Sequence, residues 1–240
     1  MLRITDSYSP ITAYQAKAIK DAGYAGSARY LGARTLQLPN GMFPSEAKRL
    51  HDAGLKIVSI WETNPTQASY FTVEQARLDA LHALEEAAWM GQPPGSAIYF
   101  TVDYDAQEAD MDAIIAYFSM IRSMVSGRYL VGAYGGIRTL ESLKGSRGAP
   151  NLYWQTLAWS GGQRFDGAAL YQGLMDQSID GLGIDVNDVL VENPGWWPIE
   201  AIAAKPVPVP EPVKREPTEW DHGYAEGIEA AIKQLEAMKR

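Results

Sequence analysis

The chain has 240 residues, of which 46% are hydrophobic and 21% charged, as is typical of a globular protein with a substantial core. Its formal net charge of -8 argues against nucleic acid as a partner, because phosphate backbones are bound by clustered Lys and Arg and the sequence has no such cluster. The absence of Cys excludes disulfides, thiolate metal sites and a cysteine nucleophile.

Short β-like runs alternate with helical ones along most of the chain. The runs are rich in Val, Ile, Tyr and Trp and bounded by Gly, Pro or Asn, and they begin at Leu2, Ser27, Leu55, Ser96, Arg128, Asn151, Ala168 and Gly181. Apolar spacing and terminal Pro or Gly predict helices over 11–22, 44–53, 73–90 and 111–125. Alternation favours a parallel sheet and eight strands favour closure, so we expect a TIM-like (β/α)8 barrel over residues 1–199. The later helices look short or missing, which predicts irregularity in its second half.

The composition changes after the barrel. Residues 200–219 carry Pro at close intervals, which predicts an extended polyproline-II linker. Residues 220–240 repeat apolar side chains at helical spacing, which predicts an amphipathic helix too short to be stable alone. We expect this helix to pack on the barrel, or on its own copy to form a homo-oligomer.

The beginning of the chain predicts the compartment of synthesis. Met1 leads directly into a strand-like run without an apolar signal-peptide segment, and no apolar run is long enough to span a bilayer. We therefore expect synthesis in the cytoplasm without a signal peptide, and no membrane partner.

Carboxylates gather where the predicted strands end. Asp6 ends the first strand, Glu62 the third, Asp103 and Asp105 the fourth, and Asp185 the eighth. The carboxyl ends of barrel strands carry function because all the loops converge there. Residues i and i+2 of a strand share a face, so Asp103 and Asp105 are both expected to point into the barrel mouth. Two carboxylates in a poorly solvated cleft divide into one acid and one base, as glycosidic bond cleavage requires.

An ordered set of motifs carries a family resemblance. The motifs are DSYSPIT at Asp6, RYLG at Arg29, YFTVDYD at Tyr99, VGAYGG at Val131, WQTLAWSGG at Trp154 and GIDVND at Gly183. Together, from about Leu2 to Trp197, they resemble the bacterial and phage glycoside-hydrolase-like domain of unknown function that is related to family-25 glycoside hydrolases, the barrel lysozymes.

The resemblance implies a site and an activity. In barrel lysozymes the first strand ends in Asp, the fourth carries Asp-x-Glu and the last carries Asp, which match Asp6, Asp103, Asp105 and Asp185 here. One position departs from that pattern, because the Glu that would serve as general acid is the shorter Asp105. Either Asp105 or Glu62, from the neighbouring strand, is then the candidate proton donor.

Structural alternatives stand beside these roles. Asp6 is also suited to capping the first helix, and Asp185 to pairing with Arg29 or Arg3. Glu62 follows an Ile-Trp pair that is typical of a core. The candidate substrate-binding residues, which are equally suited to packing or loop anchoring, are Arg29, Tyr104, Tyr134, Trp154 and Gln172. The three His are scattered over predicted helices, so we expect no metal site and no cofactor.

Two functions remain open at this level. The first is a glycosidase that cleaves the glycan of bacterial peptidoglycan, as a lysozyme-like phage endolysin acting at the cell wall would. The second is a glycan-binding or assembly module that has kept the barrel without efficient chemistry, because fold alone does not imply function.

Overall fold

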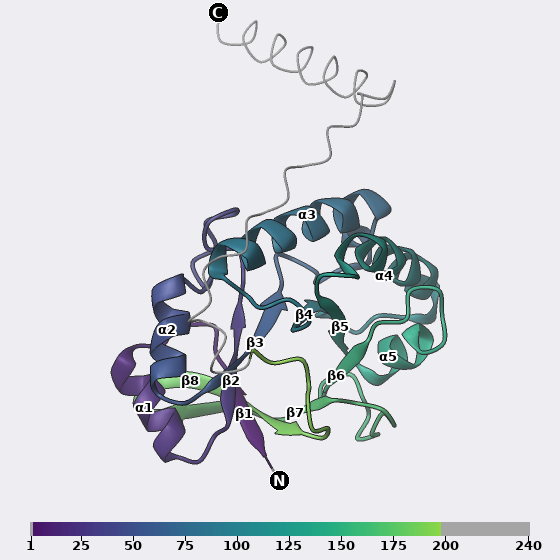
Figure 1. Cartoon of the computed structure of the whole chain (residues 1–240). Helices are drawn as coiled ribbons and strands as arrows, with labels where there is room; N and C mark the ends of the chain where they lie inside the picture. The colour runs from purple at the N-terminus through teal and green to yellow at the C-terminus, as the bar shows by residue number, and fades with distance from the viewer. Residues whose placement is uncertain (1, 198–240) are drawn as a thin grey trace, which may run out of the picture. The chain divides into compact units, whose positions relative to one another are not determined.

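The computed structural model describes residues 2–197 of the chain. They form a closed barrel in which the eight strands follow one another in sequence order (Figure 1). The strands are β1 (Arg3–Asp6), β2 (Gly26–Tyr30), β3 (Lys56–Trp61), β4 (Ala97–Thr101), β5 (Leu130–Gly135), β6 (Leu152–Thr156), β7 (Leu170–Ile179) and β8 (Leu182–Val189). The predicted closed α/β barrel of eight strands is therefore confirmed. The predicted linker (200–219) and terminal helix (220–240) lie outside the described residues.

Helices cover much of the outside of the barrel. They are α1 (Ala13–Asp21), α2 (Pro44–Asp52), α3 (Val73–Met90), α4 (Met111–Val125) and α5 (Ile137–Leu143), with single 3-10 turns η1 (Ala68–Tyr70) and η2 (Glu108–Asp110). Local sequence explains their ends: Thr12 caps α1 in a capping box with Gln15, and Gly91 ends α3 in the left-handed region at φ 72°. The four predicted helices are present, and α5 is an addition.

The barrel departs from a regular parallel (β/α)8 arrangement at its closure. Strands β1 to β7 pair in parallel, whereas β8 runs antiparallel to both β7 and β1. Within residues 2–197, no helix follows β6 or β7. Asp180 and Gly181 join β7 to β8 with φ values of 48° and 74°, and positive φ at both central residues makes a tight hairpin turn. The expectation of an all-parallel barrel is wrong at β8, because a two-residue turn cannot make a crossover.

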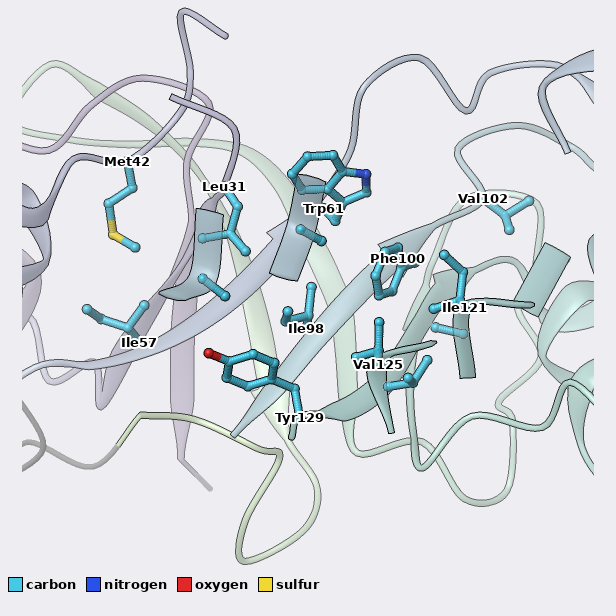
Figure 2. Close-up of a cluster of buried hydrophobic side chains, with 14 of the residues drawn as sticks. Leu31, Met42, Ile57, Trp61, Ile98, Phe100, Val102, Ile121, Val125 and Tyr129 are labelled. Atoms are coloured by element: carbon cyan, nitrogen blue, oxygen red, sulfur yellow. The ribbon is translucent and has the colours of Figure 1, made fainter. Parts of the chain in front are cut away.

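Alternation along the strands sorts the side chains into two layers. Inward positions make a core inside the barrel, with Ile4, Ala28, Val58, Tyr99 and Leu170 among its members. Outward positions pack against the helices, as Figure 2 shows for Phe100 beside Ile121 of α4. Towards the carboxyl ends of β1 to β7 the inward positions change from apolar to polar. That change produces an apolar floor below a polar mouth.

Gly132 of β5 faces the barrel core, where the Tyr99 ring fills the space. An added Cβ at Gly132 would lie 2.3 Å from Cδ1 of Tyr99. We predict that Gly132→Ala lowers the free energy of unfolding by about 1–3 kcal/mol, as overpacking of a dense core does. Denaturant unfolding measures the change.

Gly183→Ala in β8 is the matched control, because an added Cβ there meets nothing within 4 Å. Equal stability of the two alanine variants would contradict the packing of Tyr99 against Gly132.

Candidate active site

A cavity of about 180 Å³ opens at the mouth of the barrel. It is lined by four carboxylates (Asp6, Glu62, Asp103 and Asp185) together with Tyr30, Ile60, Thr101, Tyr134, Trp154 and Gln172. The lining, all of it within the described residues, includes no Lys, Arg or His. The cavity therefore gathers negative charge without a cation among the side chains that face it.

Asp6 and Asp185 lie side by side because β8 is reversed. They are direct partners in the register of β1 with β8. The side-chain amide of Gln172 donates to both carboxylates, at 3.1 Å each, and Nδ2 of Asn187 donates to Asp6 at 2.7 Å. Neutral amides thus hold this pair where an arginine or lysine would be the usual partner.

The amides are themselves fixed by aromatic side chains. The Tyr134 hydroxyl donates to Oε1 of Gln172 at 2.8 Å, and Nε1 of Trp154 donates to Oδ1 of Asn187 at 2.8 Å. Trp154 is almost fully buried and meets the Tyr134 ring edge-on, with 5.3 Å between ring centroids. Trp154 therefore forms part of the floor of the cavity, and its ring orients the Asp6 carboxylate through Asn187.

Glu62 and Asp103 line the cavity from the ends of β3 and β4. Burial raises the pKa of Glu62 from 4.5 to about 7, and the negative charges of Asp103 and Asp6 add to the effect while the Thr101 hydroxyl opposes it. Burial also raises the pKa of Asp103. At neutral pH, Glu62 is thus divided between its protonated and ionised forms.

The pKa values of Asp6 and Asp185 are raised as well. Burial raises the pKa of Asp6 from 3.8 to about 6; the Asn187 hydrogen bond lowers it and the charge of Asp185 raises it. Burial raises the pKa of Asp185, against the hydrogen bond from the backbone N–H of Asp176. Titratable groups with raised pKa values that share one cavity mark a candidate site for acid–base chemistry.

Buried acids of the outer layer anchor the loops that frame this mouth. The carboxylate of Asp79 accepts from the hydroxyls of Tyr70 and Tyr117 at 2.6 and 2.7 Å, and the Tyr70 hydroxyl also lies 2.6 Å from Oγ1 of Thr63. Thr63 directly follows Glu62. The backbone N–H of Asp103 donates to the carbonyl of Pro65 in the same loop at 3.0 Å, so these contacts tie the segments that carry Glu62 and Asp103 to each other and to α3 and α4.

Two predicted site residues lie away from the cavity because β4 ends at Thr101. The strand alternation that would align Asp103 with Asp105 does not continue that far, and Asp105 is exposed outside the lining. Tyr104 packs in a stacked arrangement on Phe71, with 5.9 Å between ring centroids. The expectation that Asp103 and Asp105 share the mouth is wrong.

Arg29 lies on the outer face of β2 and does not line the cavity. It is fully buried, its Nε lies 2.7 Å from Oε1 of Glu46, and it also donates to the backbone carbonyls of Ser7 and Asn40. These contacts anchor the loops that contain Ser7 and Asn40, and they do not support the predicted role of Arg29 in substrate binding. The alternative that Asp185 pairs with Arg29 or Arg3 is wrong, because Arg29 pairs with Glu46 and Arg3 pairs with Asp188 at 3.0 Å.

Tyr30, Thr101 and Asn187 belong to the site and escaped the sequence analysis. Alternation offered a signal for two of them: Tyr30 follows the outward-facing Arg29, and Asn187 stands two residues after Asp185. The alternative that Asp6 caps α1 is wrong, because Thr12 holds that position.

Comparison with known proteins identifies the class. Residues 17–189 match the model of the Rv2525c-like, glycoside hydrolase-like domain, and the chain belongs to this family. The uncharacterised protein YbfG of Bacillus subtilis is 34% identical over 155 residues, which cover 57% of this chain but only 21% of YbfG. The chain thus spans about a fifth of that relative.

Solved structures agree with this assignment. The Tat-secreted protein Rv2525c of Mycobacterium tuberculosis, crystallised with L-tartrate, superposes with a TM-score of 0.71 at 26% identity, over 82% of this chain and 98% of that one. A family-25 glycosyl hydrolase of Streptococcus pneumoniae, GHIP, gives a TM-score of 0.56 at 13% identity over 78% and 86%, a likeness of fold alone.

The relatives bear on the expected location. Because Rv2525c is a Tat-secreted protein, the expectation of synthesis without a signal peptide, as in an endolysin, is not supported. Among the helices of residues 2–197, none is long and apolar enough to cross a membrane.

The raised pKa of Glu62 predicts a pH-dependent effect of its replacement on stability. The folded state holds the Glu62 proton more tightly than the unfolded state, so this group's contribution to the free energy of unfolding falls as the pH rises from 4.5 to about 7. We predict that the free energy of unfolding of Glu62→Gln is higher than that of the wild type by about 1–3 kcal/mol at pH 8, as measured by denaturant unfolding. The difference shrinks towards pH 4.

Asp105→Asn serves as the control, because that carboxylate is exposed outside the cavity; its effect on the free energy of unfolding is expected to be below about 0.5 kcal/mol at both pH values. A Glu62→Gln effect that is the same at pH 4 and pH 8 would contradict the raised pKa.

Proposed function

We propose that this domain is a glycoside hydrolase that cleaves the glycan of peptidoglycan or a related N-acetylated polysaccharide, with Glu62 as proton donor. The observation that carries the proposal is the raised pKa of Glu62 in a cavity that it shares with Asp103, Asp6 and Asp185. A carboxylic acid that stays protonated near neutral pH is what protonation of a glycosidic oxygen requires. The family supplies the class of substrate, since Rv2525c is described as a proposed peptidoglycan hydrolase.

Each carboxylate has a distinct part in this mechanism. Glu62 gives its proton to the bridging oxygen as the bond to the sugar breaks. Asp103, the more accessible partner, stabilises the positive charge that develops on the ring or positions the attacking group. Asp6 and Asp185 keep the cavity negative, which favours that positive charge. Where the sugar carries an N-acetyl group, its carbonyl oxygen can serve as the nucleophile, an established exception to the two-carboxylate scheme.

The alternative function is a glycan-binding or assembly module on the same barrel. One observation favours it: Asp105, which matches the Glu of Asp-x-Glu in barrel lysozymes, is shorter than Glu and lies exposed outside the cavity. Under the proposed mechanism, Glu62 takes over the role of proton donor from the neighbouring strand. Under the alternative, the barrel has no proton donor at this site.

Reducing-sugar release from purified peptidoglycan and from chitin oligomers separates the two functions. We expect wild-type turnover, a loss of about 100-fold or more in kcat for Glu62→Gln, and near wild-type rates for Asp105→Asn. Absence of turnover by the wild type with retained glycan binding would overturn the hydrolase in favour of the binding module.

The pH dependence of the rate gives a further prediction. Since the donor must be protonated and the pKa of Glu62 is about 7, kcat/KM for the wild type is expected to fall above about pH 7. The same fall in kcat/KM above about pH 7 is expected for Asp105→Asn. A rate that keeps rising from pH 7 to pH 9 would exclude Glu62 as the acid.

A further inference from the structure

A second hollow adjoins the candidate active site. It has a volume of about 280 Å³ and lies between the loop after β1 and the β7–β8 hairpin. Asp6, Tyr30 and Asp185 line both this groove and the cavity of the barrel mouth. A ligand that fills the cavity can therefore continue into the groove across the Asp6–Asp185 pair.

The walls of the groove are joined to each other and to the site. Oγ of Ser7 donates to the carbonyl of Gly183 at 2.9 Å, which links the β1 loop to the first residues of β8. On the hairpin, the backbone N–H of Asp176 donates to Oδ1 of Asp185 at 2.8 Å. Asp176 has a φ of 57°, and the register of β7 with β8 shifts between Leu174 and Gln177, so the strand bulges at the wall of the groove.

Tyr8 gives the groove an aromatic surface. Its side chain is 62% exposed, and its ring meets the ring of Tyr30 edge-on, with 6.2 Å between centroids. A tyrosine that stands this far out of the core leaves most of its ring available to a ligand. The C–H groups on one face of a sugar ring pack against such a surface, while its hydroxyls reach polar groups at the rim.

The charge of the groove narrows the class of ligand. Its lining contains Asp6, Asp176 and Asp185 and, within the part of the chain that the structure describes, no Lys, Arg or His. An anionic sugar would meet repulsion from three carboxylates without a compensating cation. The hydroxyls of Ser7, Ser9 and Tyr8 and the amide of Gln177 suit a neutral, hydroxylated ring.

We propose that this groove is a second sugar-binding subsite, in which Tyr8 stacks on the neutral ring next to the one in the cavity. The proposal rests on the proposed function for its choice of a glycan ligand. It adds a specificity: the domain recognises chains of at least two neutral rings, and Tyr8 supplies the affinity gained from the second.

Calorimetric titration tests this with N-acetylglucosamine and its β-1,4-linked di-, tri- and tetramer as probes. The full chain carrying Glu62→Gln is used, so that binding is measured without turnover. We expect affinity to rise from one ring to two, and Tyr8→Ala on that background to lose about two- to tenfold in affinity for the dimer and longer probes only. Tyr8→Phe, which keeps the ring, should retain the gain.

Tyr14→Ala is the matched control, because Tyr14 is 69% exposed on α1 and lines neither hollow. Equal affinities of Tyr8→Ala and Tyr14→Ala for every probe would overturn the subsite and leave the proposed hydrolase standing. Length-dependent binding that Tyr8→Ala loses, in a protein whose wild type shows no turnover, would support the subsite and overturn the hydrolase. Failure of all four probes to bind would overturn the subsite, and reducing-sugar release from peptidoglycan would then decide the proposed function separately.

Discussion

Four carboxylates share one cavity that no cationic side chain of the described residues lines, and the rest of the mouth is arranged around this constraint. Ion pairing would fix these groups in the charged form, but Asp6 and Asp185 are bonded by the amides of Gln172 and Asn187. Neutral donors orient a carboxylate while leaving burial to raise its pKa, which is the direction found for all four. Such an arrangement costs folding free energy at neutral pH, as strained or destabilised functional sites commonly do.

The buried acids of the outer layer have a structural purpose. Glu46 has the guanidinium of Arg29 and the N–H of Ile11, Glu86 accepts from the N–H groups of Arg34 and Thr35, and Asp79 accepts from two tyrosines. These satisfied carboxylates hold the loops that follow β1, β2 and β3. One chain therefore uses buried carboxylates for two purposes. Those of the outer layer bond to loop segments, whereas those of the mouth line a cavity and have raised pKa values.

Asp185 lies at the mouth as predicted, although the predicted direction of its strand is wrong. Asp185 was expected at the mouth as the end of a parallel strand, but it stands in the first half of β8 and reaches the mouth because that strand runs backwards. The Asp180–Gly181 pair was the signal for a hairpin. β7 continues to Ile179, directly before this pair, so the strand runs into the turn without a helix.

Local sequence patterns were enough to predict the number of strands, four of the helices and the four carboxylates that line the cavity (Asp6, Glu62, Asp103 and Asp185). They were enough because periodicity and strand-end position are local properties of the chain. Alternation could also have supplied Tyr30 and Asn187. Contacts between distant segments were needed to show that Asp105 and Arg29 lie away from the cavity and that the pKa of Glu62 is raised. Those outcomes depend on where β4 stops, which face of β2 meets α2, and how far each carboxylate is removed from water, and all three are set by contacts between segments far apart in the sequence.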